Sequence, residues 1–421
     1  MKQEPAAFQK KEIIRSLELQ RLSSLKDIGI IKVLCGLRGS GMHTVVSQYI
    51  SRLHQLQTPE DHIIRLNLRN ALYTPLCSEQ GLFSFLNERV GREGNYYIFL
   101  EEIQYVKNFQ QTIDRFSVMD NTDMILTTSS RRIFQEELSH LLLSQYTEIN
   151  ILPLSLDECR QLMPQRERDA LFPETGLPLP ASLLLPLADR QNSPEYDKAR
   201  TLAREYLRGI LENALVRDIC PRYGISDTQG LLSLMCLVCL HRGQYLTPKS
   251  LSSLMEEELG MGMNSRTVES YLQALTDSYL ICRLPRWDIS TDQPLKTREK
   301  IYPADRAFSS ILFAVPPADG EEGSLAELEN ALCLDLLRHG YHAWTGRYRG
   351  HELSLIGISG TERIYLQCIA QGPSYPQKLK KAENILRSIP DNYRKYIVTD
   401  KDQEPENHAG ILIRTVTDLH I

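Results

Sequence analysis

Apolar runs alternate with helical patterns along the first third of the chain. The runs with the residue types of strands are IIKVLC, HIIRLNL, YYIFL, DMILTTSS and YTEINILPL, which begin at residues 30, 62, 96, 123 and 146. Between them, apolar residues recur every three or four positions, which is the period of an amphipathic helix. Because strands that alternate with helices form parallel sheets, this pattern predicts an α/β domain with a mostly parallel sheet over residues 1–155.

After residue 155 the pattern becomes helical. A long amphipathic stretch, EYDKARTLAREYLRGILENALVRDI, is followed by three shorter ones, LLSLMCLVCLHRG, TPKSLSSLMEEELG and NSRTVESYLQALTDSYLICRL. Thr247 or Pro248 can start the second of these, and Asn264 or Ser265 can cap the third. Three short helices that lead into a hairpin are the outline of a winged helix. We therefore expect a helical lid and a winged-helix region over residues 156–300.

Residues 301–421 return to a mixed pattern. A helix pattern, LAELENALCLDLLRHG, precedes three strand patterns, YHAWTGRY, ELSLIGIS and RIYLQCIA. A second helix pattern, QKLKKAENILRSIP, and a further strand, RKYIVTD, follow. This order predicts a third domain, which is small and of α/β type.

Composition narrows the class of protein. The 421 residues are too many for one ordinary domain, and a net charge of −5 argues against a protein that coats nucleic acid by charge alone. Nine scattered cysteines without framework spacing suggest reduced thiols. The first residues lack a signal-peptide core, and no apolar run is long enough to span a bilayer. These features predict a cytoplasmic protein that does not use a membrane.

The turn after the first apolar run has the frame of a phosphate-binding loop. It reads GLRGSG, it follows a strand pattern, and it precedes a helix pattern that begins near Thr44. In such a loop, backbone N–H groups and the helix N-terminus hold phosphate, a lysine neutralises it, and a Ser or Thr hydroxyl holds Mg²⁺. Here Met42 and His43 take the last two places, and methionine carries no charge. The candidate nucleotide-binding residues are Gly36, Arg38, Gly39, Ser40, Gly41, Met42, His43 and Thr44.

Two acids end the third apolar run, YYIFLEE. At a phosphate site of this kind the first acid holds Mg²⁺ and the second polarises the attacking water. We therefore assign Glu101 to the metal and Glu102 to catalysis. Successive strand residues point to opposite faces, so we expect either that the two carboxylates do different jobs or that only one of them lies in the site.

These segments resemble the prokaryotic AAA-type ATP-binding protein family. The similarity covers almost the whole chain and rests on IKVLCGLRGSG, YYIFLEEIQYVKNF, DMILTTSSRRIFQEELSHLLLSQYTEINILPLSLDEC, ALVRDICPRYGISD, SRTVESYLQALTDSYLI, KIYPADRAF, LENALCLDLLRHGY, HELSLIG and IYLQCIA. The resemblance implies a P-loop NTPase domain with a parallel sheet, a winged-helix middle region, and a C-terminal α/β domain of the restriction-endonuclease type, similar to PD-(D/E)xK nucleases. It also implies ATP and Mg²⁺ as cofactors.

The chain departs from the family pattern at polar positions of the ATPase-like domain. Met42, His43 and Glu101 stand where the family has Lys, Ser and Asp. A Gly and an Asn of the sensor strand, and a Gly-Arg pair before a tyrosine, are also replaced; the residues here are Thr128, Ser130, Ser144 and Gln145. The apolar frame around these positions is intact, which suggests a retained fold with lost or remodelled chemistry, as in a pseudoenzyme.

The nuclease-like domain departs in the same way. The positions that would serve metal binding and catalysis are Glu329, Glu352, Ser354 and Gln367. Ser354 replaces an acid, and the family's Glu-x-Lys reads Gln367-Cys368-Ile369. A metal ion would find two carboxylates, so we expect a degenerate site.

Three functions remain open. The first is an AAA-type protein with weak or absent ATP hydrolysis, in which ATP and Mg²⁺ binding is weak or lost and an unknown protein partner is bound. The second is a slow ATPase that borrows a cation such as Arg38. The third is a DNA-associated module that uses the winged helix and the basic C-terminal helix, which carries Lys378, Lys380, Lys381 and Arg387. Restoring Lys, Ser and Asp at positions 42, 43 and 101 together is expected to recover nucleotide binding.

Overall fold

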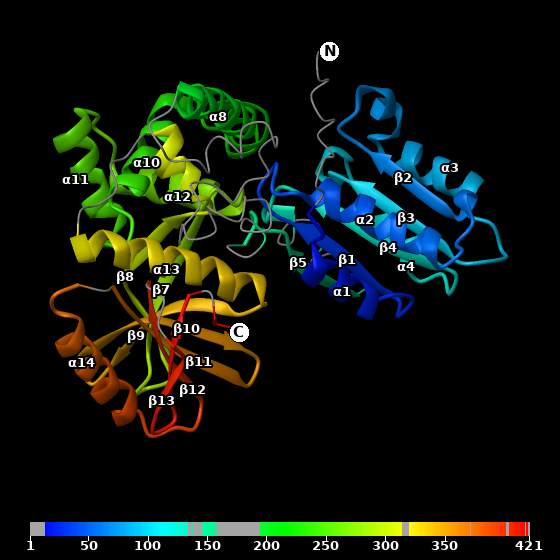
Figure 1. The fold of residues 1–421 in the computed structure, drawn as a ribbon. Helices are drawn as coiled ribbons and strands as arrows, with labels where there is room; N and C mark the ends of the chain where they lie inside the picture. Colours follow the sequence, from blue (N-terminus) through cyan, green and yellow to red (C-terminus); the bar gives the residue numbers. More distant parts are fainter. Residues whose placement is uncertain are drawn as a thin grey trace, which may run out of the picture.

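The structure is a computed structural model. It describes residues 13–133, 138, 145–155, 158, 194–313, 320–370, 372–400, 404–416, 418 and 419. A five-stranded sheet lies at the right of Figure 1, and a larger sheet lies at the lower left beneath a group of helices.

The N-terminal sheet is parallel throughout. Its strands are β1 (Ile30–Cys35), β2 (Ile63–Asn67), β3 (Tyr96–Glu101), β4 (Thr122–Thr128) and β5 (Gln145–Asn150), in the order β2-β3-β4-β1-β5. The carboxyl ends of β1 and β3 therefore flank that of β4. The prediction of an α/β domain with a parallel sheet is confirmed.

Helices cover both faces of this sheet. One face packs against α1 (Ser16–Ser24) and α2 (Met42–Gln55) through Leu34, Phe99 and Ile125. The other face, with Val33 and Ile98, packs with α3 (Glu79–Arg89) and α4 (Gln110–Ser117). Strands covered on both faces are apolar at successive positions, which explains the continuous apolar runs.

The middle region is helical and leads into a hairpin. It contains α8 (Pro194–Asn213), a π-helix (Ala214–Ile219), α9 (Cys220–Tyr223), α10 (Thr228–Leu240), β6 (Tyr245–Leu246), α11 (Pro248–Leu259), α12 (Ser265–Asp277), β7 (Ile281–Asp288) and β8 (Gln293–Pro303). Thr247 caps α11 by accepting from Ser250 N at 3.0 Å, and Asn264 caps α12 by accepting from Thr267 N at 2.9 Å. Both predicted helix starts are confirmed. Most of the predicted helical stretch directly after residue 155 lies outside the described residues.

The C-terminal elements extend the same hairpin into a nine-stranded sheet. They are α13 (Gly320–Arg338), β9 (His342–Tyr348), β10 (His351–Ser359), β11 (Glu362–Ile369), α14 (Tyr375–Ser388), β12 (Arg394–Thr399), β13 (Glu406–His408) and β14 (Ile411–Thr415). The strand order is β13-β14-β12-β11-β10-β9-β7-β8-β6. Because β7 pairs with β9, the hairpin and the C-terminal strands form one sheet, and the predicted domain limit at residue 300 falls within β8.

Within the described residues, no single helix has both the length and the apolar composition needed to cross a bilayer. One helix pair, Arg200–Tyr223 with Thr228–Leu240, meets these criteria together and is bent by 115°.

Candidate functional site

The glycine-rich turn keeps the shape of a phosphate-binding loop. It joins the end of β1 to the start of α2, and Gly39 and Gly41 have φ values of 88° and 105°, which favour glycine. A Cβ on Gly36 would lie 2.1 Å from the carbonyl oxygen of Ile151. The backbone segment after β5 therefore passes directly over the loop, and glycine is needed there for close approach.

We expect the substitution Gly36→Ala to destabilise the domain by about 1–3 kcal/mol, which is typical of overpacking, because backbone must move to admit the methyl group. Thermal unfolding followed by circular dichroism measures the effect. Gly209→Ala is the matched control, since a Cβ there meets no atom within 4 Å. A control that loses as much stability as the test variant would contradict this explanation.

Met42 is a packing residue. Its side chain is 6% exposed and belongs to an apolar cluster with Leu19 and Leu22 of α1. Helix α2 begins at Met42, whereas the pattern predicted a start near Thr44. The reason is that Gly41, in the left-handed region, occupies the N-cap position directly before it. The residue at the place of a phosphate-binding lysine thus faces the core that joins α1 to the sheet.

Glu101 is held by two basic side chains. One carboxylate oxygen accepts from Arg65 Nε at 2.7 Å, and the other contacts His43 Nδ1 at 2.8 Å. Arg65 Nη2 lies 2.9 Å from the same His43 nitrogen, which carries at most one hydrogen and so either donates to Glu101 or accepts from Arg65. Burial opposes ionisation of Glu101, but His43 and Arg65 outweigh it and lower its pKa.

Sequence reasoning placed Glu101 and His43 in the site but missed Arg65. The signal was the one charged residue inside the apolar run HIIRLNL. The strand register makes the contact possible, because Arg65 pairs with Phe99 and Asn67 with Glu101 on neighbouring parallel strands.

The donor set around Glu101 does not fit Mg²⁺. This ion takes oxygen ligands in octahedral geometry, whereas both Glu101 oxygens already contact nitrogen. The guanidinium group of Arg65 supplies positive charge beside this carboxylate. The described part of the chain contains no group of three or more His, Cys, Asp or Glu residues placed to hold a metal ion.

Glu102 has different surroundings from Glu101, and the left-handed backbone at Glu102, just after the end of β3, sets its direction. It has a φ of 59° just beyond β3, and its backbone N–H donates to Thr127 Oγ1 at 2.9 Å. Its carboxylate accepts from Ser129 Oγ at 3.0 Å and from Gln104 Nε2. Burial raises its pKa, and the neighbouring Arg38 offsets this only in part.

The polar residue that contacts Glu102 differs from those assigned to the sensor strand. Ser129 makes this contact, whereas Thr128 Oγ1 accepts from the backbone N–H of Ser130 at 3.1 Å. Ser144 lies outside the described residues, and Gln145 is exposed at the start of β5. The residue that contacts Glu102 does lie within the run TTSS. The backbone turn after β4 determines which hydroxyl of that run faces Glu102.

Arg38 is bound by the helical region. Its guanidinium lies 3.0 Å from a carboxylate oxygen of Asp218 in the π-helix and donates to Tyr105 Oη at 3.2 Å. Gly39 lies beneath Ile210 of α8, since a Cβ added there would be 3.3 Å from the Ile210 side chain. The helical region therefore packs on the glycine-rich turn. Asp218 was not identifiable from sequence, because the ion pair joins residues far apart in the chain.

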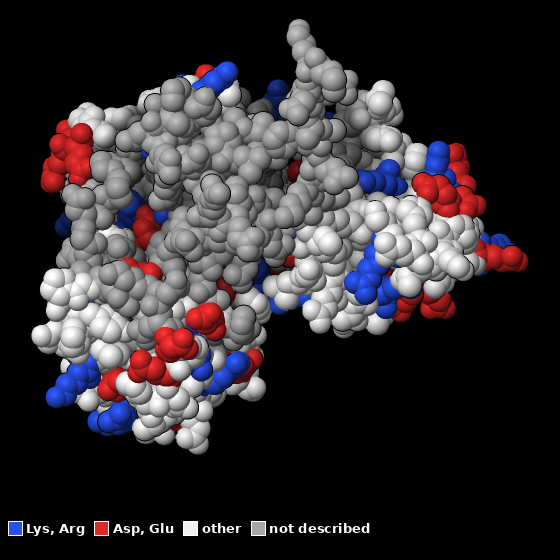
Figure 2. Space-filling view, viewed as in Figure 1, with Lys and Arg blue, Asp and Glu red and all other residues white. Residues whose placement is uncertain are grey.

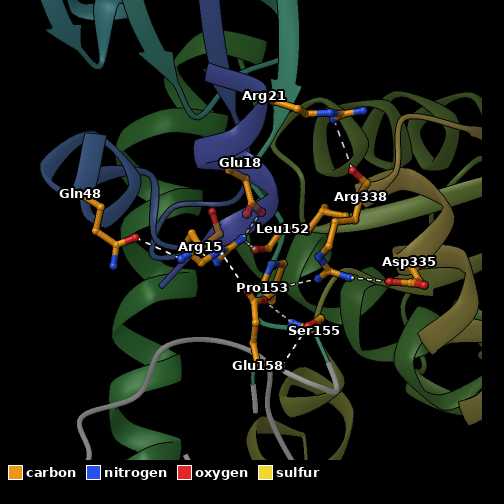
Figure 3. Close-up of polar contacts among 11 residues, drawn as sticks. Arg15, Glu18, Arg21, Gln48, Leu152, Pro153, Ser155, Glu158, Asp335 and Arg338 are labelled. Atoms are coloured by element: carbon orange, nitrogen blue, oxygen red, sulfur yellow. Dashed lines mark hydrogen bonds and ion pairs between the residues drawn. The ribbon is translucent and has the colours of Figure 1, made fainter. Parts of the chain in front are cut away.

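Two buried arginines hold the segment that follows β5 (Figure 3). Arg15, just before α1, donates to the carbonyls of Ser40 and Leu152 at 3.1 and 2.9 Å. Arg338, at the end of α13, donates to the next carbonyl, that of Pro153, at 2.6 Å. The N-terminal segment, the glycine-rich turn and the C-terminal domain are thus joined through consecutive peptide groups.

The candidate nuclease-like residues are also paired with cations. Glu329 contacts Lys300 Nζ and accepts from Tyr302 Oη, both at 2.6 Å. Glu352 lies 3.0 Å from Arg286 and 3.2 Å from Arg298. All of these cations come from the β7–β8 hairpin, which sequence reasoning did not connect with this site.

Tyr245 links the two pairs. Arg286, Arg298 and Lys300 lie 5.1, 4.5 and 5.4 Å from its ring centre. Ser354 instead accepts from the backbone N–H of Cys368 at 3.2 Å and lies 3.4 Å from Gln367. The two carboxylates that a metal ion would need are therefore each neutralised by the hairpin.

Comparisons with known proteins give two family matches, which cover the N-terminal sheet and the middle region. Residues 29–160 match the family model described as an AAA domain, and residues 193–319 match one described as a domain of unknown function, DUF8612. A protein of Haemophilus influenzae described as uncharacterized is 27% identical over 409 residues, which cover 96% of this chain and 98% of that protein.

Two solved structures show limited similarity to the chain. A Walker-type ATPase of Pyrococcus abyssi has 13% identity and a TM-score of 0.48, with 74% of this chain and 99% of that chain covered. The Orc1 protein of Aeropyrum pernix, in complex with DNA, has 15% identity and a TM-score of 0.33, with 73% and 93% covered.

The match over residues 29–160 falls on the parallel sheet described above. Its strand order brings the glycine-rich turn after β1 and the acids after β3 to the same edge. This is the edge at which parallel α/β sheets bind ligands. On the family match and this geometry, the N-terminal part of the chain is an AAA-type domain.

Proposed function

We propose that this chain is an AAA-type protein that has lost Mg²⁺-dependent ATP hydrolysis and that acts by binding other macromolecules. The observation that carries the proposal is the pairing of Glu101 with Arg65 and His43. A metal ion would have to displace a guanidinium group at 2.7 Å from a carboxylate that is 3% exposed. Because both Glu101 oxygens already have nitrogen partners, a metal ion would gain only the difference between its own interaction and the contacts it breaks, and it would leave Arg65 without its carboxylate.

The loss of charge around the loop supports the same proposal. A complete site would present a lysine and a divalent ion to the triphosphate. Here Met42 is buried, Arg65 is neutralised by Glu101, and Arg38 is neutralised by Asp218. Little net positive charge remains to balance ATP, so we infer that any nucleotide is bound weakly and without metal.

A role in interaction accounts for what the chain retains. The apolar core on both faces of the AAA-type sheet is complete, and the helical region is tied to the glycine-rich turn through Asp218 and Arg38. The three-helix and hairpin unit has the outline of a winged helix, and the C-terminal part that of a degenerate nuclease-like domain with Glu329 and Glu352 paired. We place the protein in the cytoplasm, since the eight described cysteines are all free thiols.

Calorimetric titration with ATP tests this proposal. We expect the same weak or undetectable binding in Mg²⁺ and in EDTA, and no Mg²⁺-dependent phosphate release from purified protein. The physical reason is that the Glu101 oxygens have cationic partners in both conditions. Phosphate release that requires Mg²⁺ and disappears in Glu102→Gln would overturn the proposal.

One observation favours a slow ATPase as the second candidate. Glu102 keeps polar contacts to Ser129 and Gln104, and Arg38 partly offsets the rise in its pKa that burial causes. An acid held in this way could orient a water molecule. The Glu102→Gln comparison separates the two candidates, because a purely structural Glu102 would leave background phosphate release unchanged.

A further inference from the structure

A groove of about 490 Å³ lies between α14 and the first residue of β10. It is lined by His351 and by side chains that follow one another along α14, including Gln377, Lys380, Lys381 and Asn384. Their spacing of three and four residues places the α14 side chains on one face of the helix. We call this surface the α14 groove.

The cations of the α14 groove have no acidic partner among the described residues. No ion pair joins Lys380 or Lys381 to a carboxylate in the described ranges, and the one acid of α14, Glu383, is paired with His408 instead. Arg387 lies on the same helix face as Lys380, about 10 Å along the axis. Figure 2 shows Lys and Arg side chains at the surface over α14, at the lower left, with Asp and Glu side chains beside them.

The β9–β10 turn carries a further cation, Arg349, two residues before His351 in the sequence. Arg349 stacks over the ring of Tyr348 at 5.3 Å, and Tyr348 packs in the same apolar cluster as Ile385 of α14. Arg349 is followed closely by His351, which lines the groove. The β9–β10 turn and α14 are distant in the sequence, but they share an apolar cluster, and His351 at the start of β10 lines the groove together with α14.

We propose that the α14 groove binds the phosphate backbone of double-stranded nucleic acid. Lysine and arginine neutralise phosphates, and the amides of Asn384 and Gln377 are among the groups that donate to phosphate oxygens. Single strands are bound mainly by stacking bases on aromatic side chains, and no Phe, Tyr or Trp of the described residues lines the groove. A duplex backbone, read by charge and shape, is the ligand that this combination fits.

Helix α12 does not fit the role of principal contact. In the winged-helix hypothesis its exposed face would enter a DNA groove. Glu269 on that face is paired with Arg283 at 2.8 Å, so the helix presents a neutralised pair in place of free positive charge. The α14 groove is therefore a different surface from the one that a winged helix predicts, and its role does not depend on the nucleotide site.

Fluorescence anisotropy with a labelled random-sequence DNA duplex tests the proposal in full-length protein. We expect binding at low salt whose logarithm falls with the logarithm of salt concentration, with a slope of about −2 to −4, because each neutralised phosphate contributes about −0.9. The double variant Lys380→Glu with Lys381→Glu is expected to weaken binding at least about tenfold and to reduce the slope by about 2.

The control is Lys249→Glu with Arg266→Glu, which makes the same change of charge on α11 and α12. It is expected to bind the duplex like the unaltered protein, and circular dichroism checks that both variants fold. Loss of binding in the control alone, a flat salt response, or tighter binding to single strands than to duplexes would each overturn the proposal. The same titration with an RNA duplex compares the two nucleic acids. Equal affinity for RNA and DNA duplexes supports recognition of the backbone of either one, and tighter binding of the RNA duplex identifies RNA as the preferred ligand.

Discussion

Replacing Arg15 with methionine is expected to lower the free energy of unfolding by about 3–5 kcal/mol, the cost of removing one partner of a buried ion pair. Arg15 and Glu18 have side chains that are each 2% exposed, and they lie 2.6 Å apart. The arginine also donates to the carbonyls of Ser40 and Leu152. Methionine is also a long, unbranched side chain. The loss of stability should therefore come mainly from the carboxylate and carbonyls left without a partner, and less from lost side-chain volume.

Chemical denaturation, followed by the far-ultraviolet signal, measures this effect. Arg21→Met, in the helix that follows Arg15, is the control, because the one hydrogen bond described for the Arg21 side chain is long, at 3.4 Å, and the change is expected to alter stability by less than about 0.5 kcal/mol. The double variant Arg15→Met with Glu18→Leu removes both charges of this pair but leaves Glu158, which lies 3.2 Å from Arg15 Nε, without that partner, so we expect it to regain about half of the loss. If the double variant is no more stable than Arg15→Met, the buried charge is not the cause.

The same pair makes stability depend on pH. Burial opposes ionisation of Glu18, but Arg15 outweighs it, so the pKa of Glu18 lies below its ordinary value of 4.5. A depressed pKa stabilises the folded state above the unfolded-state pKa, and this contribution is lost as pH falls through the lowered value. The difference between the unaltered protein and Arg15→Met should therefore shrink below about pH 4.

Combining Met42→Lys, His43→Ser and Glu101→Asp with Arg65→Ala is expected to tighten binding of Mg²⁺-ATP by about 100- to 10,000-fold. Two regained charge-assisted contacts, one from the lysine and one through the metal, are worth about 1.5–3 kcal/mol each, and 1.4 kcal/mol corresponds to tenfold. The structure adds Arg65 to the three positions that the sequence identified, because its Nε lies 2.7 Å from the carboxylate. Calorimetry with and without EDTA measures the gain.

The triple variant that keeps Arg65 is the matched comparison. It restores the residues expected from sequence, yet it leaves a guanidinium beside the carboxylate, so we expect it to gain at least about tenfold less than the quadruple variant. Thermal unfolding must show that a lysine is tolerated at this position, since Met42 is 6% exposed. Equal affinities for the two variants would mean that Arg65 does not occupy the metal position.

Local patterns were sufficient to predict most elements of the fold. The apolar runs predicted β1 to β5, and Thr247 and Asn264 marked the starts of α11 and α12, because caps and periodicity act between residues close in sequence. The pattern placed the start of α2 two residues late, since it did not reveal that Gly41 lies in the left-handed region. The pairing of β7 with β9, which merges two predicted domains into one sheet, has no local signal.

The residues of the candidate site also fall into two groups, those that the sequence identifies and those that only the structure identifies. The glycines, Glu101 and Glu102 were identifiable because a strand that ends in such residues has a recognisable spacing. The sequence marks Arg65 only as a charged residue inside an apolar run, and it gives no signal for Asp218 or Arg15, because each reaches the site from a segment distant in sequence. The long-range ion pairs form only when strands align and helices pack, and the chain order does not encode which cation meets which carboxylate.

The sequence alone determined that this chain has an α/β domain with a glycine-rich turn, and that Met42 leaves the turn without its usual positive charge. Both follow from residue type and spacing, because the backbone freedom of glycine and the lack of charge on methionine are properties of the residues themselves. Only the tertiary structure revealed that arginine and lysine side chains neutralise Glu101, Glu329 and Glu352. Charge pairing depends on distance in space, and parallel strands and a shared sheet bring together residues that the chain keeps far apart.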